Sequence, residues 1–392
     1  MVNEVVDLLA DLVAINSVNG SMPGGAGEAE LARYVADVGR RFGAEVELDE
    51  VLPGRPNVLL RLPATPGLVD GSACLLFDVH LDTVPLDPMP NALTPVVRDG
   101  RLWGRGACDT KGSLAAALVA LQRLGARRGP RRREVCLLGS VDEEYLKRGV
   151  HHAVGAGLAA AAAIVGEPTA LQPVIAHKGA VRWRMSTIGK AAHTSRPEFG
   201  NNAIYQMVEV IRLLRERVEP ALATRDHPLL TAPTLTVGRI DGGVGVNIVP
   251  ERCTIDVDRR TLPSEEPEAV LAEIDGLMAA LMAARPDIKV VREAPFLTER
   301  GLETPADAAV VLAAQRACRQ VLGEGARVEP CGVPFGTDGT ALWGTAGIPT
   351  VVLGPGDIAQ AHSADEWVEV RQVEQAAEIY FRIMASFVDG EW

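Results

Sequence analysis

The sequence predicts an α/β protein that carries an inserted domain of a different type. Up to about residue 179, strand-like runs alternate with helical patterns, which favours a mixed, mostly parallel sheet covered by helices. Over residues 180–294 the order becomes strand, helix, two strands, helix and strand, typical of a two-layer α+β unit of ordinary domain size. The first pattern then resumes. We therefore assign 1–179 and 295–392 to one domain and 180–294 to the insert.

Length and composition agree with two globular domains. The chain has 392 residues, which is too long for one simple core. Of these residues, 47% are hydrophobic and 23% are charged, as in ordinary globular proteins. Its net charge of −12 argues against a nucleic-acid partner, because phosphate binding needs clustered Lys and Arg. The arginine-rich run at 123–133 falls between a predicted helix and a predicted strand, so we interpret it as a solvated loop.

The sequence shows neither a targeting signal nor a disulfide pattern. No apolar stretch reaches the roughly 18 residues that span a bilayer. The start, Met1 to Glu4, lacks a basic region followed by an apolar segment. Six cysteines without CxxC spacing are typical of reduced core residues. We expect a cytoplasmic protein with no membrane partner.

The elements of the first part follow from the spacing of apolar residues. Recurrence at three and four predicts helices over 4–16 and up to residue 38, separated by a Gly/Pro loop. Further predictions are strands at 46–48, 57–60, 75–77 and 134–139, a helix from 112 to about 124, and a helical segment over the alanine-rich 158–163.

The insert begins with a run at 181–187 that alternates like an edge or half-exposed strand. The remaining predicted elements are a helix at 202–218, strands at 234–240 and 254–259, a helix at 266–284, a strand at 288–291, a helix at 306–322, a strand at 349–353 and a helix at 371–388.

Histidines and carboxylates follow the predicted strands of the outer α/β part or open a helix beside them. These side chains are His80, Asp82, Asp109, Glu143, Glu144, Glu167 and His362. Singly, such carboxylates are usually solvated or cap a helix. Because open α/β sheets bind ligands at the carboxyl ends of their strands, one edge could gather all of them. The set therefore predicts a metal site.

The residue types in this set are suited to binding two divalent metal ions. Ions about 3.5–4 Å apart need a bridging carboxylate and further N or O ligands. One more carboxylate must stay free to accept the proton of water. The consecutive Glu143 and Glu144 fit this, because one can point to the metal and its neighbour to the substrate.

Five ordered motifs resemble the zinc aminoacylase and carboxypeptidase superfamily, which includes acetylornithine deacetylase, succinyl-diaminopimelate desuccinylase and glutamate carboxypeptidase. They are His80 to Pro85, Trp103 to Gly112, Asp142 to Glu144, Gly166 to Pro168 and the late His362. The resemblance covers essentially the whole chain. It implies a zinc-peptidase-like catalytic domain, with the insert serving as a lid and dimerisation domain.

The resemblance also implies a role for each residue. His80 and Glu167 would complete one Zn²⁺ site, Glu144 and His362 the other, and Asp109 would bridge them. Glu143 would be the general base that activates the metal-bridging water, and Asp82 would hydrogen-bond the far nitrogen of His80. The peptide bond after Asp109 is expected to be cis. Such ligands also suit Co²⁺ or Mn²⁺.

The insert carries further residues of the resemblance. His193 lies in a motif similar to the lid loop, where a histidine, typically acting on the partner subunit's site, stabilises the oxyanion. Asn247 and Arg260 match substrate-contacting positions, and Arg260 is the candidate clamp for a substrate carboxylate. Arg259 is its rival, because strand alternation lets only one of them face the site.

A glycine-rich segment near the end completes the expected site. Gly336 and Thr337 belong to a segment, 335–339, that resembles a carboxylate-binding turn before a helix. Two positions depart from the family pattern, since Val79 and Leu146 stand where glycine is frequent. Neither is a ligand or the base, but Leu146 borders the site and bears on substrate preference.

We therefore expect a homodimeric, dinuclear metal-dependent amide hydrolase that removes the acyl group from an N-acylated amino acid, similar to acetylornithine deacetylases. One alternative is a carboxypeptidase or dipeptidase that uses the same metals on small peptides. Another is an inactive binding protein on the same scaffold. The intact base and the full ligand set argue against the last.

Overall fold

The structure, a computed structural model, describes residues 2–67 and 74–392. It divides into two compact units. The first comprises Met1–Ile175, Glu303–Cys331 and Thr337–Trp392, and the second comprises Ala176–Leu302 and Gly332–Gly336. The sequence placed the boundaries after residues 179 and 294 and did not anticipate the short return of the chain at 332–336.

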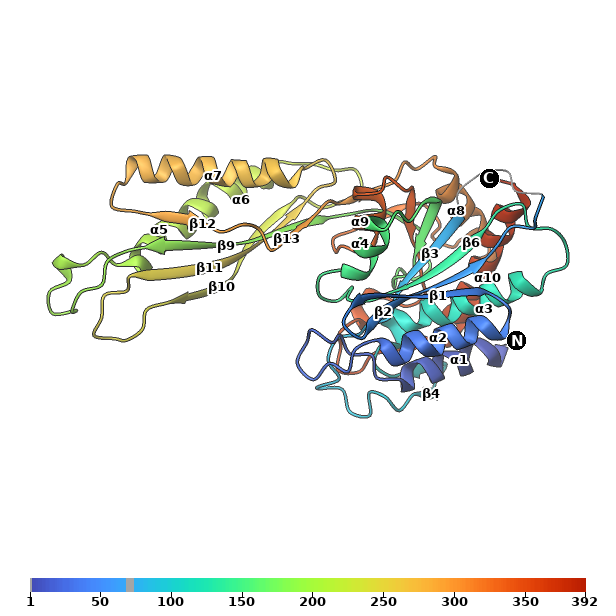
Figure 1. Cartoon of the computed structure of the whole chain (residues 1–392). Helices are drawn as coiled ribbons and strands as arrows, with labels where there is room; N and C mark the ends of the chain where they lie inside the picture. The colour runs from blue at the N-terminus through green and yellow to red at the C-terminus, as the bar shows by residue number, and fades with distance from the viewer. Residues whose placement is uncertain (1, 68–73) are drawn as a thin grey trace. The chain divides into compact units, whose positions relative to one another are not determined.

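A nine-stranded sheet forms the centre of the first unit, in the order β1-β2-β6-β3-β7-β16-β8-β14, with β15 paired to β8 (Figure 1). The strands are β1 Glu45–Leu52, β2 Arg55–Leu62, β3 Cys74–His80, β6 Val135–Ser140, β7 Ala160–Val165, β8 Val174–His177, β14 Leu302–Glu303, β15 Cys331–Val333 and β16 Thr350–Val352. The four central strands, from β6 to β16, run parallel, and antiparallel β2 and β8 flank them. The predicted α/β class with a mostly parallel sheet is confirmed.

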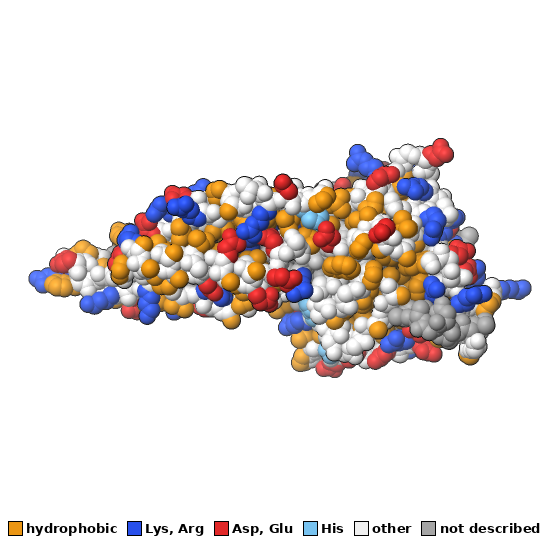
Figure 2. Space-filling view, turned by 90° about the horizontal axis from the view of Figure 1, so that it is seen from above, with side chains coloured by type: hydrophobic (Ala, Val, Ile, Leu, Met, Phe, Trp, Pro, Cys, Tyr) orange, Lys and Arg blue, Asp and Glu red, His pale blue; other side chains and the backbone are white. Residues whose placement is uncertain are grey.

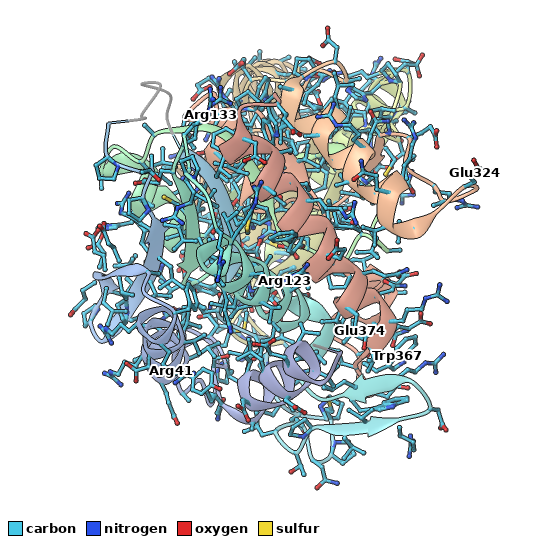
Figure 3. All side chains as sticks on the ribbon, turned by 90° about the vertical axis from the view of Figure 1, so that its right-hand side faces the viewer. Arg41, Arg123, Arg133, Glu324, Trp367 and Glu374 are labelled. Carbon is cyan, nitrogen blue, oxygen red and sulfur yellow. The ribbon has the colours of Figure 1, made fainter. Side chains whose placement is uncertain are left out.

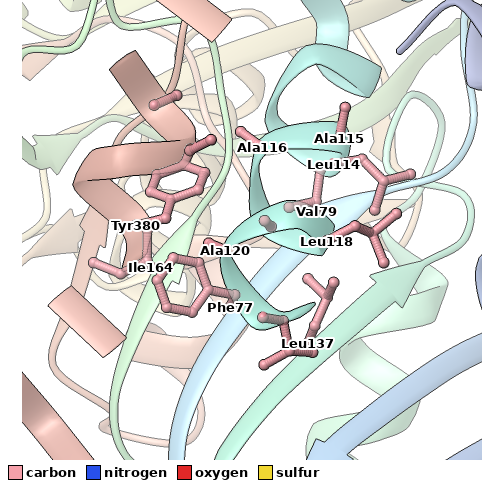
Figure 4. Packing of buried hydrophobic residues seen from close by; sticks show 14 of the residues in the cluster. Phe77, Val79, Leu114, Ala115, Ala116, Leu118, Ala120, Leu137, Ile164 and Tyr380 are labelled. Atoms are coloured by element: carbon pink, nitrogen blue, oxygen red, sulfur yellow. The ribbon is translucent and has the colours of Figure 1, made fainter. Parts of the chain in front are cut away.

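Helices bury one face of this sheet. They are α1 Val2–Ala14, α2 Ala29–Arg41, α3 Gly112–Ala126, α8 Ala309–Leu322 and α10 Val370–Asp389. Their apolar residues form one core with alternate residues of the central strands, such as Phe77 and Leu137 (Figure 4). Phe77 meets Tyr380 of α10 edge to face, with ring centroids 5.1 Å apart. Figure 3 shows α10 along the outside of the unit, where Arg123 of α3 pairs with Glu378 at 2.7 Å.

The other face of the sheet carries the second set of alternate residues, including Leu76, Asp78 and His80 of β3. Two short helices lie on this side, α4 Arg148–Gly155 and α9 Gly339–Gly344. Leu138 of β6 and Ala153 of α4 line one hollow, and Ser140 at the end of β6 donates to Asp338 before α9 at 2.8 Å. The face that ends in His80 is therefore the face that α4 and α9 cover.

The second unit is a separate two-layer structure. Its sheet has the order β10-β11-β9-β12, with β13 also paired to β9. Its elements are β9 Gly179–Ile188, α5 Ala203–Leu213, α6 Glu219–Leu222, β10 Thr234–Gly242, β11 Arg252–Thr261, α7 Pro267–Ala284, β12 Val290–Arg292 and β13 Leu297–Glu299. Trp183 and Ile255 share a core with α5 and α7. The strand predicted to be an edge or half-exposed strand is instead central and mostly buried, because β9 pairs with β11 on one side and with β12 and β13 on the other.

One predicted helix is wrong. The alanine-rich segment 158–163 lies mostly in strand β7, parallel to β3 and β16. Alanine has the highest helix propensity, but residues of this segment pair with the parallel strands β3 and β16, and this tertiary context outweighs propensity.

A small third sheet also escaped prediction. It consists of β4 Val96–Arg98, β5 Arg101–Trp103 and β17 Trp367–Glu369. Trp103 and Trp367 lie across from each other in β5 and β17, with ring centroids 6.0 Å apart.

The distribution of surface charge and the length and polarity of the helices are relevant to binding nucleic acid or a membrane. On the face seen in Figure 2, acidic and basic side chains are interspersed rather than segregated. Among the residues that the structure describes, every helix is too short or too polar to be a candidate for crossing a membrane.

Candidate metal centre

Five of the predicted side chains converge in the first unit as two overlapping groups. The groups are His80, Asp109 and Glu167, and Asp109, Glu144 and His362, with the ligand atoms of each group within 4.8 Å of one another. His80 Nε2 lies 3.1 Å from Asp109 Oδ1, and His362 Nε2 lies 3.3 Å from Asp109 Oδ2. Each oxygen of Asp109 thus faces a different histidine, as a carboxylate that bridges two metal ions would.

Strand ends supply most of these residues. His80 ends β3, Glu144 follows β6, and Glu167 follows β7, and these three strands are parallel neighbours in the sheet. His362 Nε2 approaches Glu144 Oε2 to 3.0 Å, and His80 Nε2 lies 3.9 Å from Glu167 Oε1. The edge of a parallel sheet therefore gathers the candidate ligands.

The buried carboxylates of this cluster would be stabilised in their charged form by a bound cation. Burial, followed by the charge of Asp109, raises the pKa of Glu144 to about 7, and burial raises the pKa of Glu167 well above its usual range. Hydrogen bonds to Asp109 and Glu144 raise the pKa of His362 to about 10. Without a counter-charge, these buried carboxylates share protons with the two imidazoles. Divalent cations would replace those protons, so the donor set fits a dinuclear metal site.

Glu143 belongs to neither ligand group, although it precedes Glu144. Its carboxylate is buried and lies 3.2 Å from the ammonium of Lys147. It also contributes to the pKa shifts of His80 and Glu167, so its charge acts on the cluster. A free carboxylate beside a metal cluster is suited to accept a proton.

The contact expected between Asp82 and His80 takes a different form. His80 Nδ1 lies 2.9 Å from the backbone carbonyl of Asp82, whereas the Asp82 carboxylate is 3.8 Å away. That carboxylate instead accepts hydrogen bonds from the backbone N–H groups of Glu143 and Glu144, both at 3.0 Å, and from Asn19 at 2.7 Å. Two residues beyond the strand end, the chain turns, so its carbonyl reaches the imidazole first. Asp82 thus positions the Glu143–Glu144 loop.

Glu366 holds the loop that carries Asp109, and sequence reasoning missed it. One of its oxygens accepts from the backbone N–H groups of Cys108 and Asp109, at 2.9 and 3.0 Å. The other accepts from the Gly106 N–H and the Arg105 guanidinium, both at 2.9 Å. The expected cis peptide bond is present between Asp109 and Thr110. A lone glutamate in a late loop gives no sequence signal for such a role.

His193 lies in the second unit and is exposed. Its Nδ1 accepts a hydrogen bond from the backbone N–H of Ser195 at 3.1 Å, and the Ser195 hydroxyl lies 2.8 Å from the same nitrogen. In neutral imidazole the other nitrogen then carries the hydrogen. His193 thus presents Nε2–H as a donor. Asn247, also exposed, accepts from the Thr194 N–H through its backbone carbonyl at 3.2 Å.

The neighbouring Arg259 and Arg260 of β11 face opposite sides of their sheet. Arg259 is buried, and its guanidinium lies 2.5 Å from Glu265. Arg260 is half-buried, with its Nε 3.0 Å from Asp258. Of these two neighbours, Arg260 is the one whose guanidinium is accessible to a ligand.

The predicted carboxylate-binding turn is split between the two units, with Gly336 in the second and Thr337 in the first. The Thr337 hydroxyl accepts from the Gly339 N–H at 3.1 Å. The hydroxyl thereby provides a hydrogen-bond acceptor for the first N–H group of α9.

Comparisons with known proteins agree with this centre. Residues 76–386 match the model of the peptidase family M20/M25/M40. The chain is a member of peptidase family M20. This M20 protein is 35% identical over 338 residues to an acetylornithine deacetylase from Myxococcus xanthus, covering 83% of each chain. It is 31% identical to an acetylornithine deacetylase from Proteus mirabilis, covering 92% of this chain and 89% of the relative. Family and relatives identify it as an enzyme that acts on amides.

Solved structures share the fold of this M20 enzyme. A tripeptidase from Staphylococcus aureus superposes with a TM-score of 0.81 at 22% identity and covers 99% of each chain. A protein from Bacillus subtilis, described as a dinuclear metal-binding peptidase of the M20 family, gives a TM-score of 0.73 at 14% identity and covers 99% of this chain and 98% of its own. At these identities the likeness concerns the fold alone.

Proposed function

We propose that this M20 enzyme is a dinuclear metal-dependent amidohydrolase that releases the acyl group from an N-acylated amino acid. The observation that carries the proposal is the shared Asp109, which joins two ligand groups, with Glu143 beside them and outside both. The named relatives at about a third identity support the deacylase class. Zn²⁺ suits these N and O ligands, as would Co²⁺ or Mn²⁺.

The metal pair, when bound, would polarise the amide carbonyl and make a water molecule more acidic. Glu143 accepts a proton from that water while the water oxygen attacks the carbonyl carbon of the amide. The same carboxylic acid then protonates the leaving nitrogen as the C–N bond breaks. The Lys147 ammonium lies 3.2 Å from the Glu143 carboxylate.

Four residues of the second unit, together with Thr337 of the first, would act on the substrate. His193, through Nε2–H, would donate to the oxyanion of the tetrahedral intermediate. Arg260 would pair with the substrate carboxylate, and Asn247, Gly336 and Thr337 would line the substrate site.

The proposed enzyme is a homodimer that associates through the second unit. Apolar side chains stay exposed there, including Tyr205 at 73% and Val246 at 99%. Both line a hollow of about 840 Å³ with Pro197 and Ile248. An apolar surface of this kind is typical of an interface, so a second copy would cover it. We place the enzyme in the cytoplasm, where its free cysteines stay reduced.

The test is amine release from N-acetyl amino acids, N-succinyl amino acids and dipeptides, with metal-stripped enzyme before and after zinc is restored. Zinc-dependent turnover of acyl amino acids alone supports the proposal and identifies the acyl group. Turnover of dipeptides instead assigns the enzyme to the carboxypeptidase and dipeptidase alternative. Absence of turnover with both metals bound contradicts N-acetyl and N-succinyl amino acids as substrates and leaves the metal site standing.

A further inference from the structure

A second cluster of ligand-type side chains lies at the opposite end of β3 from His80. Cys74 begins β3, Cys136 lies in β6, and Glu134 directly precedes β6. One ligand atom from each lies within 4.8 Å of the others. Because β3 is seven residues long, its two ends are about 20 Å apart. The cluster therefore shares no residue with the hydrolytic centre.

The contacts within this cluster bring the two thiols and the carboxylate together. Cys136 Sγ lies 3.2 Å from Glu134 Oε1. The Arg61 guanidinium lies 3.5 Å from Glu134 Oε1 and 4.0 Å from Cys136 Sγ. Both thiols are buried, so neither faces bulk solvent.

We propose that Cys74, Cys136 and Glu134 bind one thiophilic divalent cation, Zn²⁺, at a site separate from the hydrolytic pair. Tetrahedral zinc holds sulfur ligands at about 2.3 Å and carboxylate oxygens at about 2.0–2.2 Å, which places neighbouring ligand atoms about 3.5–3.8 Å apart. In the cluster, Cys136 Sγ and Glu134 Oε1 are 3.2 Å apart, and all three ligand atoms lie within 4.8 Å of one another. Two thiolates and one carboxylate carry three negative charges, and Zn²⁺ together with Arg61 balances them.

The strand register favours a bridging cation over a disulfide. Leu76 of β3 lies opposite Cys136 of β6, so Cys74 is two residues away along its strand. Steps of about 4.8 Å across the sheet and about 6.6 Å along it put the two Cα atoms about 8 Å apart. A disulfide needs a separation of at most about 6.8 Å. A metal ion spans the longer diagonal because it adds two bonds between the sulfurs.

A hollow beside the cluster supplies a route for the ion. It has a volume of about 360 Å³ and is lined by Arg61, Leu138 and Ala159, among others. Cys74 Sγ lies 3.5 Å from the Ala159 carbonyl. Water from this hollow can fill the fourth position of the ion. The bound cation would tie the start of β3 to β6 and so stabilise the first unit without taking part in hydrolysis.

The experiment is a Cd²⁺ titration of the reduced, zinc-loaded enzyme, followed by thiolate-to-cadmium charge-transfer absorption in the ultraviolet. The hydrolytic ligands are nitrogen and oxygen, so Cd²⁺ exchange there gives no such band. We expect a band that saturates at one equivalent of Cd²⁺. It should be lost in Cys74→Ser and in Cys136→Ser. It should persist in the control Cys318→Ser, whose thiol is buried in α8.

Glu134→Gln keeps the proposal testable if a buried serine impairs folding, because Glu134 is partly exposed. This variant should keep the band but bind Cd²⁺ about tenfold more weakly or worse. Absence of a band in the wild type would overturn the site. So would a band that survives in both serine variants, or a Cys74–Cys136 disulfide in protein purified without reductant. None of these outcomes depends on whether the enzyme hydrolyses acyl amino acids.

Discussion

Glu366→Gln is the sharpest test of how the metal centre is held. The glutamate accepts four hydrogen bonds, two on each oxygen. Glutamine replaces one oxygen with an NH₂ group, so in either orientation two donors face another donor. Hydrogen bonds to a charged group contribute about 1.5–3 kcal/mol each, and their loss should cost about 3–6 kcal/mol. The buried Arg105 also loses its ion-pair partner.

This loss should appear in two measurements. A change of 1 kcal/mol moves the melting temperature of a domain this size by about 2 °C, so metal-free Glu366→Gln should melt about 6–12 °C lower than the wild type. Because either orientation removes two of the four hydrogen bonds that hold the 105–109 loop, metal affinity should fall about 10–100-fold. The matched control is Glu324→Gln at an exposed turn after α8 (Figure 3), which should change neither quantity. A variant that melts within about 2 °C of the wild type and keeps its metal affinity would refute the positioning role.

Three further substitutions and one treatment test the other parts of the centre. Glu143→Ala should keep both metals but lose about 10²–10⁴-fold in kcat, and loss of metal on analysis would contradict its assignment as the base. His193→Ala should lower kcat about 10²–10³-fold at unchanged metal content. If it acts across a dimer, mixing it with Glu143→Ala subunits should restore activity, whereas an active monomer in sedimentation would exclude this arrangement. In Asp82→Asn, the side-chain NH₂ group would face a backbone N–H group that now donates to the carboxylate, so the Glu143–Glu144 loop loses a hydrogen bond. Metal binding should weaken about tenfold or more, measured by competition with a chelator. Stripping the metals from the wild type should lower its melting temperature, because buried Glu144 and Glu167 lose their counter-charge. An unchanged melting curve would argue against metals there.

Periodic patterns and strand ends could be predicted from the sequence, because both depend on local spacing. The helices over α1, α3, α7 and α10 follow from apolar recurrence, and they form within a few residues of their predicted bounds. The candidate ligands could be found because strand ends collect at one sheet edge. Local spacing therefore accounts for the α/β class and for the convergence of five side chains in the first unit.

Contacts between distant segments could not be predicted. The segment at 158–163 carries the composition of a helix, and only its neighbours in the sheet make it a strand. Glu366 contacts a loop more than 250 residues earlier in the chain. The carboxylate of Asp82 holds a loop 61 residues later, rather than the histidine two residues before it. In each case the deciding partner is set by tertiary structure, which no local pattern records.

The position of His362 and Glu366 in the chain has a consequence for biosynthesis. Both come from the last part of a 392-residue sequence, yet one completes a ligand group and the other fixes the loop of the shared carboxylate. A chain still emerging from the ribosome would expose His80, Asp109 and Glu144 long before these two residues are made. Until then the acidic edge of the sheet has no complete coordination sphere. Metal acquisition should therefore wait until residues 362–366 have been synthesised and have folded onto the first unit.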